Sequence, residues 1–333
     1  MYIVLKNKFR NLFLAFGILA VIIMLFTFDV SYDELLDNLR RAGFYLPLVL
    51  VLWLFIYLIN TLSWYIILRS SGPVNSLSFA RLYKFTVSGF ALNYVTPVGL
   101  MGGEPYRIME LTPYVGVERA TSSVILYVMM HIFSHFCFWL SSVLIYVFFY
   151  PVGWGMGIVL GLTTLFCLLL VTLFIKGYRN GMAVACVRLG SHIPFLKKRA
   201  VRFAELHKEK LETIDSQIAL LHQQRKSTFY LALGLEYTAR IVGCLEVWLI
   251  LNVLTTDVSF VGCILIVAFS SLLANLLFFL PMQLGGREGG FALAVAGLSL
   301  SGAYGVFAAL ITRVREMVWI VIGLVLMKIG NRR

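Results

Sequence analysis

Residues 96–107 read TPVGLMGGEPYR, and this glycine-rich stretch interrupts one of the long apolar runs of the chain. A second stretch, 280–288, reads LPMQLGGRE and interrupts another apolar run. Each contains a proline, a short spacer, two glycines and then a glutamate, with one extra residue before the second glutamate. Proline ends a helix and paired glycines permit a sharp turn. The two stretches therefore predict two broken helices.

The composition around these stretches is that of a membrane protein. Of the 333 residues, 60% are hydrophobic and 13% are charged, and the mean hydropathy is +0.88. Several apolar runs reach the ~20 residues with which a helix crosses a bilayer. No polar block is long enough to form a separate soluble catalytic domain. We therefore predict a single transmembrane domain over residues 1–333.

The apolar runs predict an all-α polytopic fold with six full transmembrane helices and two re-entrant or broken-helix elements. The full spans are expected near residues 12–28, 44–68, 121–149, 155–175, 229–254 and 303–329. The first run follows basic residues but lacks a small-residue cleavage site. It therefore favours an uncleaved helix over a signal peptide.

Residues 177–227 form a basic insertion between two spans. Between Lys176 and Lys226 there are eleven Lys or Arg residues against four Asp or Glu residues. Such an excess is typical of a loop that stays in the cytoplasm, and we predict a helical insertion there. Lipid headgroups or a cytoplasmic lipid-modifying enzyme are alternative partners for it. The insertion lacks the interleaved aromatic residues of a nucleic-acid groove, so no nucleic-acid partner is expected.

Counting spans from this cytoplasmic loop gives the topology. The chain lies inside at Lys84 and again at Arg119, so the segment with the first interruption enters and returns. The segment 258–302 begins and ends outside, which makes it the mirror image of the first. Paired interruptions of this kind are typical of inverted repeats with broken helices near the midplane. Both termini are then predicted to be cytoplasmic, in the cytoplasmic (inner) membrane.

Charged residues next to the two glycine pairs carry the expected chemistry. A half-helix that starts after the glycines points its positive N-terminal end at the cavity, and arginines there suit a phosphate. Glu104 and Glu288 either cap these half-helices or belong to a site. The candidate substrate-binding residues are Gly102, Gly103, Glu104, Arg107, Gly285, Gly286, Arg287, Glu288 and Arg313.

Other charges also fall inside apolar runs, where they are costly and normally face the bundle interior. Arg313 lies about ten residues into the last span, and Arg315 and Glu316 follow it. Arg313 either contacts substrate or pairs with Glu104 or Glu288. Glu236 and Arg240 are spaced for a pair on one helix.

His131 and His135 share one helix face, which permits a metal ligand, a proton path or ordinary packing. Neither an HExxH motif nor a Ser-His-Asp set is present. We therefore expect no catalytic residues, no metal and no cofactor.

The two motifs, at 97–107 and 281–288, and a late span with Arg313 and Gly323 resemble the transmembrane domain of lysylphosphatidylglycerol synthases. That domain is also found alone, as flippase-like membrane proteins. The resemblance covers nearly the whole chain. The soluble aminoacyl-transferase domain of the full synthases would follow the last span, where this chain ends. The resemblance therefore implies lipid translocation and gives no basis for expecting lysyl transfer.

The expected function is translocation of an anionic phospholipid or a polyprenyl-linked lipid, such as a polyprenyl phosphate, through a polar intramembrane cavity. One alternative is a membrane-embedded transferase that acts on a lipid phosphate, with Glu104 or Glu288 as base. Another is an accessory subunit whose basic insertion docks a lipid-modifying enzyme.

Overall fold

The protein is all-helical in the computed structural model, which describes residues 40–74, 76–95, 102–180, 209, 212, 215–216, 226–276 and 286–329. Within these residues every regular element is a helix, as the sequence predicts. The expected first span and most of the basic insertion lie outside the described residues. So do Pro97, Pro281 and Gly285.

Five long helices correspond to the expected full spans after the first. They are α3 (Tyr45–Ser70), α6 (Val117–Phe149), α7 (Trp154–Asn180), α11 (Lys226–Leu251) and α14 (Gly302–Lys328). By length and composition, Tyr45–Ser70, Val117–Phe149 and Trp154–Leu173 are apolar enough to cross a membrane. Many of their large apolar side chains are exposed, including most of those on α7. Such a surface fits lipid as its surroundings.

α11 and α14 are about as long as these helices but differ in composition. Each carries three charged residues well inside an otherwise apolar sequence. These residues are Glu236, Arg240, Glu246, Arg313, Arg315 and Glu316. Most of them are buried inside the bundle. Charges at such positions normally face the protein interior, because exposure to lipid tails is costly.

The first interruption separates two shorter helices, α4 (Phe79–Val95) and α5 (Gly103–Val115). The two helices pack closely because both carry glycine at the contact. A Cβ added at Gly103 would lie 2.2 Å from the carbonyl oxygen of Gly89. The side chain of Asn93 joins the helices, since its Oδ1 accepts a hydrogen bond of 2.8 Å from the Gly103 N–H. Asn93 thus satisfies a free backbone group of the broken helix.

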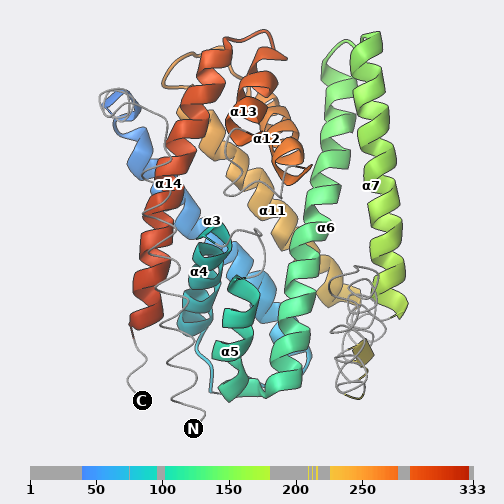
Figure 1. The fold of residues 1–333 in the computed structure, drawn as a ribbon, viewed down its shortest axis with the longest axis vertical. Helices are drawn as coiled ribbons and strands as arrows, with labels where there is room; N and C mark the ends of the chain where they lie inside the picture. The colour runs from blue at the N-terminus through green and yellow to red at the C-terminus, as the bar shows by residue number, and fades with distance from the viewer. Residues whose placement is uncertain are drawn as a thin grey trace, which may run out of the picture.

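The second interruption separates α12 (Phe260–Leu276) from α13 (Gly286–Ala296). These helices pack against each other at Gly290, where a Cβ would lie 3.4 Å from Ser270. The pair α4–α5 lies at the end of the bundle where α14 ends, and the pair α12–α13 lies at the opposite end (Figure 1). Opposite ends are what the inverted-repeat hypothesis requires, and the repeat itself stays a prediction.

α14 connects the two broken elements because it packs on both α4 and α13. Small residues allow both contacts. A Cβ at Gly323 would lie 2.5 Å from Ala91 of α4, and a Cβ at Gly305 would lie 2.5 Å from the Phe291 carbonyl of α13. Ser88 of α4 also donates a hydrogen bond of 2.9 Å to the carbonyl of Gly323. The charged middle of α14 therefore lies between the two interruptions.

Candidate functional site

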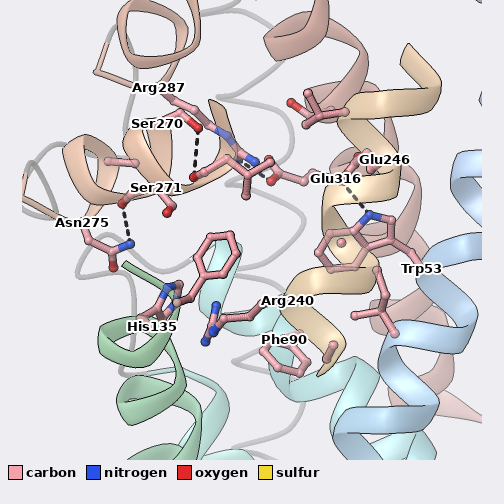
Figure 2. A pocket seen from close by; sticks show the side chains of 18 of the residues that line it. Trp53, Phe90, His135, Arg240, Glu246, Ser270, Ser271, Asn275, Arg287 and Glu316 are labelled. Carbon is pink, nitrogen blue, oxygen red and sulfur yellow. Dashed lines mark hydrogen bonds and ion pairs between the residues drawn. The ribbon is translucent and has the colours of Figure 1, made fainter. Parts of the chain in front are cut away.

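A cavity of about 280 Å³ lies inside the helix bundle (Figure 2). Its volume is close to the lower end of the ~300–1,000 Å³ that is typical of small-ligand sites. Side chains from α3, α4, α6, α11, α12, α13 and α14 form its wall. The charged residues in the wall are Glu236, Arg240, Glu246, Arg287, Arg315 and Glu316.

The cavity lies near the middle of the spanning helices. Asn60 of α3, His131 of α6 and Arg315 of α14 all line it, and each lies near the centre of its helix. Each helix turn rises 5.4 Å, so these residues lie several turns from either end of their helices. Polar groups at this depth are costly unless they are paired or bind a ligand.

Residues that flank both interruptions reach this one cavity. Tyr94 comes from the last turn of α4, Asn275 from the last turn of α12 and Arg287 from the first turn of α13. Asn275 donates a hydrogen bond of 2.8 Å to the Ser271 carbonyl of its own helix. The two broken elements, far apart in the sequence, thus border a common space.

One wall of the cavity is a chain of ion pairs between α11, α13 and α14. Arg287 contacts Glu316. The guanidinium of Arg315 binds both carboxylate oxygens of Glu246, at 2.8 and 3.0 Å, and its Nη1 lies 3.7 Å from Glu316. Trp53 of α3 donates a hydrogen bond of 2.8 Å to Glu246, and its ring lies 3.7 Å from the Arg315 guanidinium. Alternating signs and bidentate geometry offset the cost of burying these charges.

The opposite part of the wall contains the histidine pair. Glu236 is buried, and its Oε2 accepts hydrogen bonds from Asn60 Nδ2 at 3.0 Å and from His131 Nδ1 at 2.8 Å. His131 and His135 stack edge to face, with ring centroids 5.7 Å apart. Arg240 donates one hydrogen bond to Ser134 and one to the His131 carbonyl, each 2.6 Å long. The described residues contain no cluster of His, Cys, Asp and Glu that fits a metal ion.

Glu104 and Arg107 lie at the start of α5, outside the cavity lining. They form an ion pair of 3.2 Å, and Asn93 donates a second hydrogen bond, of 2.9 Å, to the same carboxylate oxygen. The backbone N–H of Gly103 is capped by Asn93 rather than by Glu104. The Arg107 guanidinium also stacks over Phe90, which lines the cavity, at 4.7 Å.

Glu288 and Arg313 form a second pair outside the cavity lining, at 2.8 Å. This is one of the two roles that the sequence leaves open for Arg313. Gly102 and Gly286 lie at the starts of α5 and α13. Of the substrate-binding residues proposed from the sequence that the structure describes, Arg287 lines the cavity and the others do not. Substrate binding by the others stays a prediction.

Sequence comparison assigns this helical architecture to a known family. The model of the lysylphosphatidylglycerol synthase TM region matches residues 12–324. The chain belongs to this family. A UPF0104 membrane protein from Methanothermobacter thermautotrophicus is 23% identical over 323 residues, which cover 94% of this chain and 92% of that protein. No solved structure matches the chain.

Membership of the lysylphosphatidylglycerol synthase TM-region family confirms the resemblance seen in the sequence over nearly the whole chain. It also makes this protein a multi-pass membrane protein. The glycine-rich motifs led to the correct family, although Arg287 is the motif residue that lines the cavity among those that the structure describes.

The polar residues of the wall that sequence reasoning missed include Trp53, Asn60 and Glu246. Glu246 had a detectable signal, because it is a third charge inside one apolar span, ten residues after Glu236. Charges within spans mark the bundle interior. Trp53 and Asn60 had a weaker signal, since single polar or aromatic residues in a span also occur at ordinary helix contacts.

Proposed function

We propose that this protein translocates a lipid, a phospholipid or a polyprenyl-linked lipid, across the cytoplasmic membrane. The polar headgroup would cross through the charged cavity while the acyl or prenyl tails remain in the bilayer. The observation that carries this proposal is a cavity with six charged wall residues at the centre of the spanning helices. Moving a charged headgroup through hydrocarbon is costly, and a polar cavity lowers that cost.

Membership of the lysylphosphatidylglycerol synthase TM-region family supports the proposal, because the family is named after a phospholipid. The broken helices support it as well. In membrane transporters, substrate sites lie near the midplane where discontinuous helices meet. Here Tyr94, Asn275 and Arg287 border the cavity from the ends of three such helices.

The transferase alternative receives less support from the geometry. It requires Glu104 or Glu288 as a general base. Glu104 pairs with Arg107 and Glu288 pairs with Arg313. Each carboxylate is therefore already engaged by an arginine, and neither of the two glutamates lines the cavity.

Reconstitution of the purified protein tests the proposal. Liposomes would carry a headgroup-labelled phospholipid or polyprenyl phosphate, and leaflet-specific quenching would report its movement. We expect faster movement than in protein-free liposomes. The double variant Arg287→Gln, Glu316→Gln keeps the cavity neutral and removes the contacts of Glu316 with Arg287 and Arg315, and we expect it to slow movement. The exposed residue Arg69 provides the control variant Arg69→Gln. Movement no faster than in empty liposomes, for every lipid tested, would reject the proposal.

A further inference from the structure

One turn of α11 presents two charged side chains to the cavity, Glu236 and Arg240. Their spacing of four residues places them on the same helix face. The sequence therefore predicts that they pair with each other. Their hydrogen bonds instead go in different directions, because Glu236 bonds Asn60 of α3 and Arg240 bonds Ser134 of α6. His131 bonds both, through its ring to Glu236 and through its carbonyl to Arg240.

Arg240 differs from the other arginines inside the bundle. Arg107, Arg287, Arg313 and Arg315 each contact a glutamate. Arg240 bonds a hydroxyl and a carbonyl, which are neutral acceptors, and within the described part of the chain it has no carboxylate in ion-pair range. In Figure 2 its guanidinium points into the cavity beside His135. An uncompensated guanidinium in a cavity wall is suited to a phosphate.

Glu236 has the complementary feature. The residue is 1% exposed, and its second carboxylate oxygen, Oε1, is buried and has no hydrogen-bond partner among the residues that the structure describes. Leaving a buried charged acceptor unsatisfied is costly, which favours a ligand that donates to it. His135 adds another such group to the same wall, because its Nδ1 is buried and has no hydrogen-bond partner in the described part of the chain.

We propose that this turn of α11 binds a zwitterionic headgroup, a phosphodiester that carries a primary ammonium group. Arg240, with His135 beside it, binds the phosphate oxygens, and Glu236 Oε1 accepts a hydrogen bond from the ammonium. The inference deepens the proposed function and rests on it, since the cavity is taken as the headgroup path.

The charge of the whole cavity favours this class of lipid. Among the residues that the structure describes, its wall holds Arg240, Arg287 and Arg315 against Glu236, Glu246 and Glu316, so these arginines and glutamates balance. A zwitterion keeps that balance and satisfies both unpaired groups at once. An anionic glycerol headgroup satisfies Arg240 but adds a net negative charge next to Glu236. A quaternary ammonium has no N–H to donate.

Native mass spectrometry of the full-length protein in detergent tests this inference through binding alone. The probes are phosphatidylethanolamine, phosphatidylglycerol and phosphatidylcholine with identical acyl chains. We expect phosphatidylethanolamine to bind most tightly. Arg240→Gln removes charge-assisted hydrogen bonds to the phosphate that all three share, and should weaken all three by about tenfold or more. Glu236→Gln should remove the preference for phosphatidylethanolamine and leave phosphatidylglycerol binding largely intact.

Arg69→Gln is the control for a lost arginine outside the cavity, and Arg240→Lys keeps the positive charge and should retain most of the binding. Thermal unfolding of each variant checks its folding. If Arg240→Gln does not fold, the test rests on two results: the wild-type preference for phosphatidylethanolamine and the loss of that preference in Glu236→Gln.

Equal or tighter binding of phosphatidylglycerol by the wild type would overturn the inference. So would a headgroup preference that survives Glu236→Gln. A clear preference without any lipid movement in liposomes would reject the proposed function and leave this binding site standing.

Discussion

Arg315 shows how single residues keep charge stable inside this bundle. It is buried near the centre of α14, binds both oxygens of Glu246 and stacks on Trp53. Glu246 is satisfied from two sides, because Trp53 also donates to it. Each group thus has several partners, and removing one leaves the opposite charge buried and unpaired.

Replacing Arg315 with methionine should therefore lower the free energy of unfolding by about 3–5 kcal/mol. The double variant Arg315→Met, Glu246→Gln should lose less than the sum of the two single variants, because neither charge is then left alone. Denaturant titration in detergent micelles measures these differences. A single-variant loss below about 1 kcal/mol would show that this pair does not stabilise the bundle.

Asn93 likewise satisfies two polar groups at the start of α5. It accepts from the Gly103 N–H and donates to Glu104. Asn93→Ala should lower the free energy of unfolding by about 1–2 kcal/mol, because a helix cap and a charged hydrogen bond are lost together. The same titration reports it. Asn252→Ala is the comparison, since Asn252 bonds a carbonyl of its own helix and should cost less. Equal losses for the two variants would contradict the capping role.

At the scale of elements, close helix contacts depend on glycine at a few positions. The contact between α4 and α5 leaves no room for a Cβ at Gly103, and the contacts of α14 leave none at Gly305 or Gly323. Gly103 lets α5 pack on α4, and Gly305 and Gly323 let α14 pack on α13 and α4. The half-helices are short, with 17 and 13 residues in the first pair and 17 and 11 in the second. Packing therefore supplies most of what holds them in place.

Gly103→Ala should be strongly destabilising, because the obstructing atom is the Gly89 backbone carbonyl rather than a flexible side chain. The matched control is Gly161→Ala in α7, where a Cβ would meet nothing within 4 Å. There we expect an unchanged free energy of unfolding, or a gain of up to about 1 kcal/mol from the higher helix propensity of alanine. Thermal unfolding of both variants provides the comparison. Similar unfolding temperatures for the two would contradict the close packing of α4 and α5.

At the scale of the whole molecule, the cavity unites helices from distant parts of the sequence. Hydropathy predicts the all-helical membrane fold, and the two Gly-Gly-Glu stretches predict its two interruptions and lead to the family. Each of these features is local in the sequence, so it is readable without a structure.

Charge partners were harder to predict, because they depend on how the helices rotate and cross. Spacing suggested that Glu236 and Arg240 pair, yet each bonds a different helix. The sequence also left two possible ion-pair partners for Arg313, Glu104 and Glu288, and the fold pairs it with Glu288. The glycine motifs predict a site at the helix ends, whereas most of the described cavity wall comes from helix centres.

We propose the cavity as the route by which the lipid headgroup crosses the membrane, and this can be tested by filling the cavity. Gly243 of α11 lines the cavity, and the nearest atom to a Cβ there would be Ile56 Cδ1, at 4.0 Å. Gly234, on the same helix, is exposed, and a Cβ there would meet nothing within 4 Å. Phenylalanine at Gly243 therefore fills the cavity without removing a charge, while phenylalanine at Gly234 projects from the outer surface of the bundle.

The decisive measurement is lipid movement in liposomes that contain the wild type, Gly243→Phe or Gly234→Phe, with each variant shown to unfold at a temperature near that of the wild type. The account predicts that Gly243→Phe abolishes the movement and that Gly234→Phe retains it. Movement at the wild-type rate with the cavity filled would contradict the account.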